Sequence, residues 1–216
     1  MMAKTNIGLV DFAVDKLGID YVYGTKGEVL TKAKYNALKK MYPDMVWDSD
    51  VKKVGKICTD CAGLIDWYLG VDKSSSMYYN EAKKKFGVHK ISTIASAPVG
   101  AAVWRKGHIG VYIGNGFAIE ARGSAYGVVR TKVANRDWTH WFLLSDITYI
   151  QSVQYFKKYT GASGSIVDAL NSIGATSSFA YRKKIAAAND IKLYVGTAKQ
   201  NTTMLNLLKA GKLIEP

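Results

Sequence analysis

The chain has 216 residues, of which 48% are hydrophobic and 22% charged, which is typical of a globular protein with one main domain and a smaller second one. No stretch reaches the apolar length of a membrane-spanning helix, so stable membrane insertion is not expected. The 30 Lys and Arg against 17 Asp and Glu give a net charge of +13 and favour a polyanionic partner. No nucleic-acid-binding motif is recognisable, which argues against nucleic acid as that partner.

The first six residues lack the apolar core and the small-residue cleavage site of a secretory signal. We therefore expect a protein that is made in the cytoplasm without a signal peptide. If it acts outside the cell, another factor must release it.

The first expected element is a helix that begins after Thr5, because apolar residues follow helical spacing from Ile7 to Leu17. Gly18 suits its end. A short aromatic turn or strand follows, up to Gly24. Together these features place a helix and a turn before the long polar stretch that comes next.

Residues 25–57 form a long, polar, lysine-rich segment with a helix expected over about Leu30 to Met41, which Pro43 ends. Its charged side chains are interpreted as a solvated face, with a polymer contact as the alternative. They are Lys39, Lys40, Lys52, Lys53 and Lys56.

A buried helix is expected directly after Asp60, which is a good N-cap. Cys61 would then lie at or beside the first helical position, and the helix would end at Gly70. The positive end of a helix stabilises a thiolate and lowers its pKa, as a nucleophile requires. The alternative is that Cys61 is a small core residue, as most free cysteines are.

The only other cysteine is Cys58, and the pair has no two further ligands at regular spacing. A zinc site needs four ligands, so we expect no metal and no cofactor. A disulfide between the two would silence Cys61 as a nucleophile. Cys58 is therefore interpreted as a bystander.

The pattern then changes from helix to sheet. A helix is expected over Met77 to Phe86, followed by short strands over residues 101–104, 108–113, 117–121 and 128–133. Asn115-Gly116 between the second and third strands is a strong hairpin signal. Helices first and an antiparallel sheet second make an α+β fold.

The C-terminal part is read as a separate helical module. Gly161 to Ser165 has the composition of a linker, and three helical patterns follow, over about residues 166–173, 178–188 and 201–210. We expect one domain over residues 1–158, a linker over 159–165 and a module over 166–216.

A cysteine nucleophile needs a base that titrates near neutrality, and His108 at the start of a strand is the best candidate. Glu120 lies on the return strand of the hairpin. A two-residue turn sets it opposite Val111, whereas a three-residue loop sets it opposite Gly110 on the same face as His108. We favour the second register, in which Glu120 orients the His108 ring. Alternatively, both residues are ordinary surface groups.

Three segments in this order resemble the NlpC/p60 family of papain-like cysteine peptidases, which cut cell-wall peptides. They are residues 21–24 (Tyr-Val-Tyr-Gly), 60–64 (Asp-Cys-Ala-Gly-Leu) and 107–116 (Gly-His-Ile-Gly-Val-Tyr-Ile-Gly-Asn-Gly). The resemblance covers roughly residues 5–145 and implies a papain-like core of N-terminal helices on an antiparallel sheet. It implies that Cys61 is the nucleophile, that His108 is the base, and that Tyr21 positions the cysteine or the oxyanion.

The chain departs from this pattern at three places. Glu120 stands where the family often has His, Gly100-Ala101 stands where it has Gly-Asp, and the 25–57 segment is longer than in short members. The insertion could cover or shape the cleft. Asp60, Trp138 and His140 are candidates for a substrate groove.

The tail is similar to the wall-targeting modules of phage and prophage lysins of Gram-positive hosts, on residues 181–189 and 196–202. A catalytic domain, a linker and a small basic module are the layout of an endolysin, for which a holin pore would provide release. The expected partner is thus bacterial peptidoglycan, with a wall polymer bound by the module.

The expected activity is hydrolysis of a stem-peptide amide through a thioester on Cys61. The resemblance points to the bond between γ-D-glutamate and the diamino acid. The N-acetylmuramoyl-L-alanine amide is an alternative, as are acyl transfer from the same thioester and a non-enzymatic basic protein that binds the cell wall.

Overall fold

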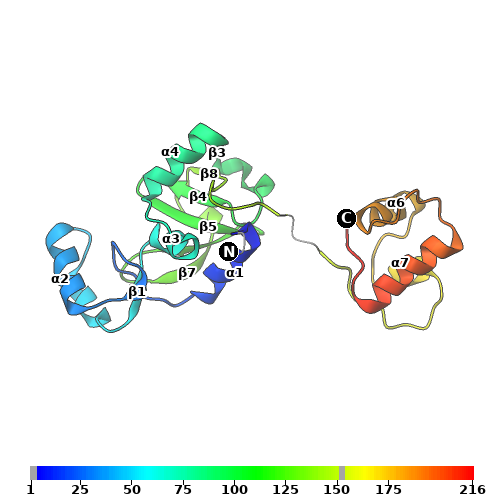
Figure 1. The fold of residues 1–216 in the computed structure, drawn as a ribbon, viewed down its shortest axis with the longest axis horizontal. Helices are drawn as coiled ribbons and strands as arrows, with labels where there is room; N and C mark the ends of the chain where they lie inside the picture. Colours follow the sequence, from blue (N-terminus) through cyan, green and yellow to red (C-terminus); the bar gives the residue numbers. More distant parts are fainter. Residues whose placement is uncertain (1–3, 151–153) are drawn as a thin grey trace. The chain divides into compact units, whose positions relative to one another are not determined.

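The computed structural model describes residues 4–150 and 154–216, and the chain divides into two compact units, Met1–Gln151 and Ser152–Pro216 (Figure 1). We call these unit 1 and unit 2. Within the described residues, no helix is both long enough and apolar enough to cross a membrane.

Unit 1 places helices before and around a six-stranded antiparallel sheet with the strand order β3-β8-β4-β5-β6-β7. Its α-helices are α1 (Asn6–Asp15), α2 (Lys32–Met41), α3 (Gly63–Leu69) and α4 (Ser75–Lys85). The sheet consists of β3 (His89–Lys90), β4 (Ala102–Arg105), β5 (His108–Gly114), β6 (Phe117–Ala121), β7 (Val128–Lys132) and β8 (His140–Phe142). Short 3-10 helices span Asp48–Lys53, Ile91–Ser96 and Val133–Asn135. The expected α+β class, with helices on an antiparallel sheet, is confirmed.

The helix starts follow from side-chain caps that the sequence shows. Thr5 accepts a hydrogen bond from the Gly8 N–H at 3.1 Å, and Ser74 accepts one from Met77 at 3.2 Å. Such caps satisfy N–H groups that have no partner inside the helix. The main strands also lie where the alternation predicts them, whereas the two-residue β3 and the three-residue β8 were not predicted.

The two faces of the sheet pack against different hydrophobic clusters. Ile109, Val111 and Ile119 face a core that contains Leu64 and Ile65 of α3. Each fully buried side chain of this size contributes about 1.5–3 kcal/mol. The intervening residues of β5 and β6 point to the second face, which carries a smaller cluster: Tyr112, Ala118, Val133, Trp138 and Trp141 among others. This alternation puts His108 and Glu120 on the second face.

The hairpin register sets Glu120 against Gly110, as predicted, although the turn differs from the predicted one. The turn has two residues, Asn115 and Gly116, both with positive φ (52° and 74°). A bulge between Tyr112 and Gly114 supplies the extra residue, so that Val111 pairs with Ile119. Continuing this antiparallel register by one residue sets Gly110 opposite Glu120. A Cβ on Gly110 would lie 3.2 Å from the Glu120 Cβ, so glycine makes room for the acid.

The 25–57 insertion is a small subdomain with its own core. The strands β1 (Lys26–Val29) and β2 (Ile57–Thr59) pair antiparallel and flank α2. The buried residues of this core are Val22, Leu30, Tyr35, Leu38, Val46 and Cys58. The insertion is therefore a folded element beside the sheet and not a loop.

One lysine of the insertion is not on a solvated face, contrary to the prediction. The Lys53 side chain is only 11% exposed and lies 2.7 Å from the buried carboxylate of Asp50. Its Nζ also donates to the carbonyl oxygens of Tyr21 (2.7 Å) and Ser124 (2.8 Å). Lys53 thus ties the insertion to the Tyr21 segment and to the loop that follows β6.

Unit 2 is a three-helix module with a separate core. Its helices are α5 (Ile166–Ser172), α6 (Phe179–Ala188) and α7 (Ala198–Ala210). The core consists of Phe156, Tyr159, Ile166, Ala169, Leu170, Ile185, Ala186, Tyr194, Met204, Leu205, Leu208 and Leu213. The predicted helical C-terminal part is confirmed, and α7 begins three residues earlier than expected because Thr197 caps it.

The boundary between the units differs from the predicted 158/159 border and the 159–165 linker. Phe156 and Tyr159 are buried in the unit 2 core, and Phe156 N–H donates to Leu213 at 2.9 Å. Ser163 N–H donates to the Tyr159 hydroxyl at 3.0 Å, and Ser165 caps α5. The glycine- and serine-rich stretch is therefore a loop inside unit 2, and the units divide after Gln151.

Candidate active site

Cys61 lies in a tight turn between β2 and α3 that Asp60 holds. One carboxylate oxygen of Asp60 accepts from Gly63 N–H at 2.7 Å, and the other accepts from Gly24 N–H at 2.8 Å. Contrary to the prediction, Asp60 is not the N-cap of α3, which is Ala62 without a side-chain capping bond; the Asp60 carboxylate closes the turn before the helix. The helix itself begins at Gly63, so Cys61 precedes it by two residues. The second bond links the Cys61 turn to the end of the Tyr21–Gly24 segment.

The thiol of Cys61 is neutral in this structure, in contrast to the lowered pKa that its place at a helix start predicts. Burial and the neighbouring Asp60 carboxylate raise the pKa of Cys61 to about 12. The backbone N–H groups of Ile109, Ala62 and Cys61 itself act in the opposite direction. The prediction was wrong because removal of water outweighs these dipoles. The thiol consequently needs a base.

Ile109 places the start of β5 beside Cys61, and His108 is the residue before it. The His108 side chain is 8% exposed and has one hydrogen-bond partner in the described chain, Glu120, at 2.7 Å from its Nε2. The other ring nitrogen, Nδ1, has no partner among these residues, and no hydrogen bond joins His108 to Cys61 within them. Nδ1 is therefore the ring nitrogen that can accept a proton.

Glu120 is a fully buried carboxylate with four short contacts. Besides His108, it accepts from Thr131 Oγ1 at 2.7 Å, from Arg136 Nε at 2.8 Å and from Arg136 Nη2 at 3.0 Å. Burial would raise the pKa of Glu120, but hydrogen bonds from His108, Arg136 and Thr131 lower it to about 2. Glu120 is thus an anion held in one place, which stabilises a protonated imidazole beside it.

The sequence did not predict the contacts of Arg136 and Thr131 with Glu120. Thr131 lies on β7 and its contact follows from the register, because β7 pairs with β6 throughout. Arg136 lies in the segment after β7, and its bidentate contact is of the kind that arginine makes with carboxylates. A buried acid that needs a cation was a usable signal, but the sequence contains too many basic residues to choose one.

Trp138 contacts His108, whereas His140, the other groove candidate of this part of the chain, does not. The Trp138 ring stacks on His108 with 5.2 Å between the centroids and 8° between the planes. Its indole N–H is buried without a hydrogen-bond partner in the described residues. His140 lies on β8, where its ring contacts Tyr79 and Trp104 and its Nδ1 lies 2.9 Å from Thr139 Oγ1.

Tyr21 is 8% exposed and belongs to the same buried cluster as Cys61. Burial raises the pKa of its hydroxyl, and the neighbouring Cys61 and Asp60 raise it further. The hydroxyl is therefore protonated, and it donates to no group within the described residues. It remains available to donate to a bound molecule.

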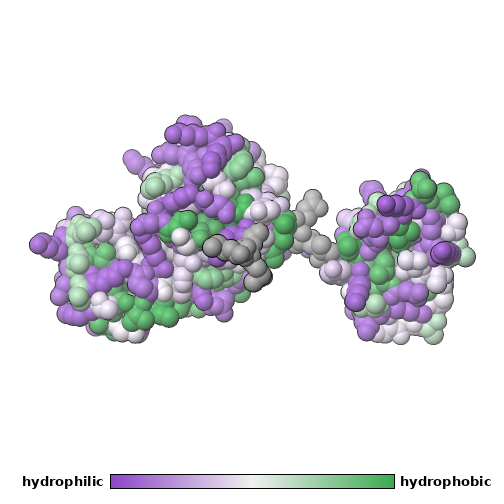
Figure 2. Space-filling model, viewed as in Figure 1, coloured by the Kyte–Doolittle hydropathy of each residue, from purple (hydrophilic) through white to green (hydrophobic). Residues whose placement is uncertain are grey.

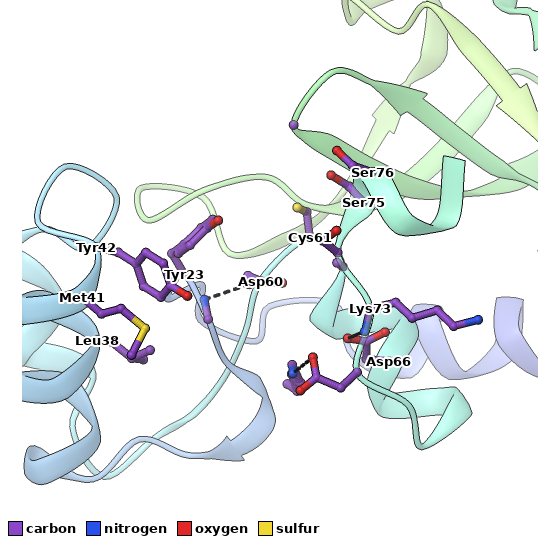
Figure 3. Close-up of a pocket in the computed structure, with 16 residues that line it drawn as sticks. Tyr23, Leu38, Met41, Tyr42, Asp60, Cys61, Asp66, Lys73, Ser75 and Ser76 are labelled. Atoms are coloured by element: carbon purple, nitrogen blue, oxygen red, sulfur yellow. Dashed lines mark hydrogen bonds and ion pairs between the residues drawn. The ribbon is translucent and has the colours of Figure 1, made fainter. Parts of the chain in front are cut away.

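A pocket of about 420 Å³ opens on one side of Cys61 (Figure 3). The insertion contributes an apolar wall of Leu38, Met41 and Tyr42. Tyr23 lies on the same side, with its ring 5.0 Å from that of Tyr42. The remaining lining is mostly polar and includes Asp60, Asp66, Lys73, Ser75, Ser76 and Gly107. The insertion thus shapes the cavity at Cys61.

Cys58 differs from Cys61 in its place, because Cys61 lines the pocket and Cys58 does not. It lies on β2, it is fully buried in the insertion core, and both cysteines are free. Burial raises its pKa to about 11. No group of three or more His, Cys, Asp or Glu in the described part of the chain could hold a metal ion.

Comparisons with known proteins find matches that cover only part of this chain, and no family model matches. The chain is 57% identical over 47 residues to an L-alanyl-D-glutamate peptidase of Listeria phage A118, which is 22% of this chain and 17% of that protein. Among solved structures, NlpC2 from Trichomonas vaginalis shares 16% identity over 67% of this chain and 48% of its own, with a TM-score of 0.44.

Two bacterial structures give similar values. The peptidoglycan hydrolase RipB from Mycobacterium tuberculosis has a TM-score of 0.42 and 20% identity, over 67% of each chain. The P60 domain of a Mycobacterium avium subspecies paratuberculosis antigen has a TM-score of 0.42 and 21% identity, over 67% of this chain and 98% of that one. This chain therefore spans about half of the Trichomonas protein and a sixth of the phage peptidase. It is similar to NlpC/p60 proteins in structure and, over a short stretch, to a phage peptidase in sequence.

Proposed function

We propose that unit 1 is a cysteine peptidase that cleaves an amide bond in the stem peptide of bacterial peptidoglycan. The observation that carries this proposal is the His108–Glu120 pair. A buried carboxylate occupies Nε2 of the ring at 2.7 Å and leaves Nδ1 free next to the strand start that contacts Cys61. The resemblance of the three sequence segments and the similarity to a phage peptidase support the choice of substrate.

In the proposed first step, Nδ1 of His108 takes the proton of the Cys61 thiol as the sulfur attacks the carbonyl carbon of the amide. General-base catalysis is needed because the thiol is neutral at rest. The anionic Glu120 stabilises the imidazolium, and the Trp138 ring that stacks on His108 holds its plane. The Tyr21 hydroxyl and backbone N–H groups near the sulfur donate to the oxyanion.

In the second step the C–N bond breaks, His108 gives its proton to the leaving amine, and a thioester remains on Cys61. A water molecule then attacks the thioester while His108 accepts its proton. The C–S bond breaks, and the products are a carboxylic acid and the free thiol. No redox partner takes part.

We propose the bond between γ-D-glutamate and the diamino acid as the target, on the strength of the sequence resemblance. The N-acetylmuramoyl-L-alanine amide is the alternative target. The phage relative is described as a peptidase for a third bond, between L-alanine and D-glutamate. Mass spectrometry of products from purified peptidoglycan identifies the bond, because each leaves different new ends.

Unit 2 is proposed to bind the cell wall. After Thr160 the chain has 7 Lys and Arg against 3 Asp and Glu, an excess that favours an anionic target. Together with unit 1, this arrangement is that of an endolysin. Deletion of unit 2 should reduce wall binding more than the turnover of small soluble peptides.

The decisive experiment compares Cys61→Ala with Cys58→Ala in the full chain. We expect Cys61→Ala to abolish lysis of cell walls while it retains the fold and wall binding, and Cys58→Ala to retain lysis. Unchanged lysis by Cys61→Ala would contradict the mechanism and favour a non-enzymatic wall-binding protein. Addition of an amine acceptor separates hydrolysis from acyl transfer, since only transfer gives the acceptor amide as the main product.

A further inference from the structure

The loop between α6 and α7 is held rigidly by one side chain. Gln200 Oε1 accepts from the N–H groups of Val195 (3.1 Å), Gly196 (3.1 Å) and Thr197 (3.2 Å). Its Nε2 donates to the carbonyls of Lys192 (3.3 Å) and Leu193 (3.0 Å). These five bonds span residues 192–197, which we call the clamped loop. A helix cap alone needs only one such bond.

The centre of the clamped loop is anchored to the helices by Tyr194. Its side chain is buried, and its hydroxyl accepts from Arg182 Nε at 3.0 Å and donates to Asn201 at 2.5 Å. Asn201 in turn donates to the Gly196 carbonyl at 3.0 Å. The loop conformation is therefore set by α6 and α7 before any partner arrives, which lowers the entropic cost of binding.

The residues on either side of Tyr194 point outward and are aliphatic. Leu193 is 92% exposed and Val195 is 69% exposed. Leu193 also has a φ of 50°, in the left-handed region that costs a non-glycine residue about 1–2 kcal/mol. A plain turn would use Gly or Asn at this position. Strained residues that persist in a fixed loop tend to lie at binding sites.

Phe179 extends this apolar surface. It is 46% exposed, and a Cβ on Gly196 would lie 3.1 Å from its ring, so the ring lies against the loop. Figure 2 shows hydrophobic residues beside hydrophilic ones on the visible face of unit 2. We call Phe179, Leu193 and Val195 the recognition surface.

Cations surround the recognition surface. The Phe179 ring centroid lies 5.9 Å from the Arg182 guanidinium carbon and 5.7 Å from Lys183 Nζ. Lys192, the first residue of the clamped loop, and Lys199, in the first turn of α7, are exposed. No ion pair forms within residues 154–216, so these charges are not neutralised inside the part of unit 2 that the structure describes.

We propose that the recognition surface binds the acidic, alanine-containing peptide of peptidoglycan. This inference rests on the proposed function of unit 2. A γ-linked D-glutamate leaves its α-carboxylate free, and alanine offers a methyl group, so the peptide matches both the cations and the aliphatic side chains. A polyol phosphate would satisfy the cations but would leave Leu193 and Val195 without apolar partners.

The test uses the full chain with Cys61→Ala, so that the wall is bound and not digested. Cosedimentation is measured with Gram-positive sacculi before and after acid extraction of the secondary polymers, with soluble stem peptides as competitors. Leu193→Asn should weaken binding at least about tenfold while the thermal midpoint stays equal or rises, because Asn tolerates the left-handed region. Tyr155→Asn, a change at an exposed aromatic outside the surface, is the control.

Binding that survives extraction, is displaced by stem peptides and falls with Leu193→Asn supports the proposal. Loss of binding on extraction would assign the surface to a wall polymer and overturn it. Equal binding of the parent and of Leu193→Asn would show that the recognition surface does not bind the wall and would overturn the proposal. Stronger binding to phosphatidylglycerol vesicles than to sacculi would assign the surface to lipid and also overturn the proposal. Failure of the parent to bind any sacculi would instead refute wall targeting by unit 2, independently of hydrolysis by unit 1.

Discussion

The residues that we propose to be functional lie at opposite extremes of exposure in the two units. In unit 1, Glu120 is fully buried, and His108 and Cys61 are 6% and 7% exposed. In unit 2, the clamped loop presents Leu193 at 92%. The difference is physical: proton transfer needs fixed charges away from water, whereas recognition of an insoluble polymer needs side chains that reach the surface. In both regions hydrogen bonds fix the conformation, around the Glu120 carboxylate in unit 1 and around the Gln200 amide in unit 2.

The largest effects should come from changes to the buried His108–Glu120 pair. Glu120→Gln should lower kcat by about 10²-fold or more, because the amide does not stabilise imidazolium as an anion does. Loss of His108 should cost more. Turnover of soluble stem peptides across pH is the measurement, and Thr131→Val, which removes only one hydrogen bond to Glu120, is the control. Equal activity of Glu120→Gln and the parent would assign the orienting role to another group.

The Glu120 carboxylate should also make the stability of unit 1 depend on pH in the acidic range. The folded pKa of Glu120 is about 2, below its ordinary value of 4.5, so its contribution is present above pH 4.5 and is lost as pH falls toward 2. The free energy of unfolding of the parent should therefore fall toward that of Glu120→Gln over this range. Denaturant titrations followed by tryptophan fluorescence report this, because all five tryptophans lie in unit 1. A difference between the two proteins that stays constant with pH would contradict the assignment.

The Cys61 thiol should respond to its neighbouring carboxylate. Asp60→Asn should lower the pKa of Cys61 because the Asp60 charge is one of the groups that raise it. The thiolate absorbance in the ultraviolet, titrated in a Cys58→Ala background, measures a single thiol. An unchanged or higher pKa would show that burial alone sets the value.

The smallest effect should be confined to unit 2. Thr197→Ala removes the cap of α7 and should cost unit 2 about 1 kcal/mol. Circular dichroism should show a lower unfolding midpoint for the helical transition, while tryptophan fluorescence should show no change in unit 1. A matching shift in fluorescence would mean that the two units do not unfold independently.

Local signals in the sequence predicted most elements, because caps and turns act over three or four residues. Thr5, Ser74 and the Asn115-Gly116 turn lie where their chemistry requires them. Short strands such as β3 and β8 were missed because two or three residues carry no periodicity. The unit boundary was misplaced because composition cannot show that Phe156 packs on a core formed by later residues.

Sequence patterns alone predicted the α+β class and the hairpin that carries His108 and Glu120, and they favoured Cys61 over Cys58 as the proposed nucleophile. The protonation and the hydrogen-bond partners of these groups depend on tertiary contacts. Burial raises the pKa of the Cys61 thiol against the backbone N–H groups of Ile109, Ala62 and Cys61 itself. The bidentate Arg136 comes from a segment 16 residues beyond Glu120. Desolvation and long-range ion pairs depend on which atoms exclude water and which meet in space, and spacing along the chain specifies neither.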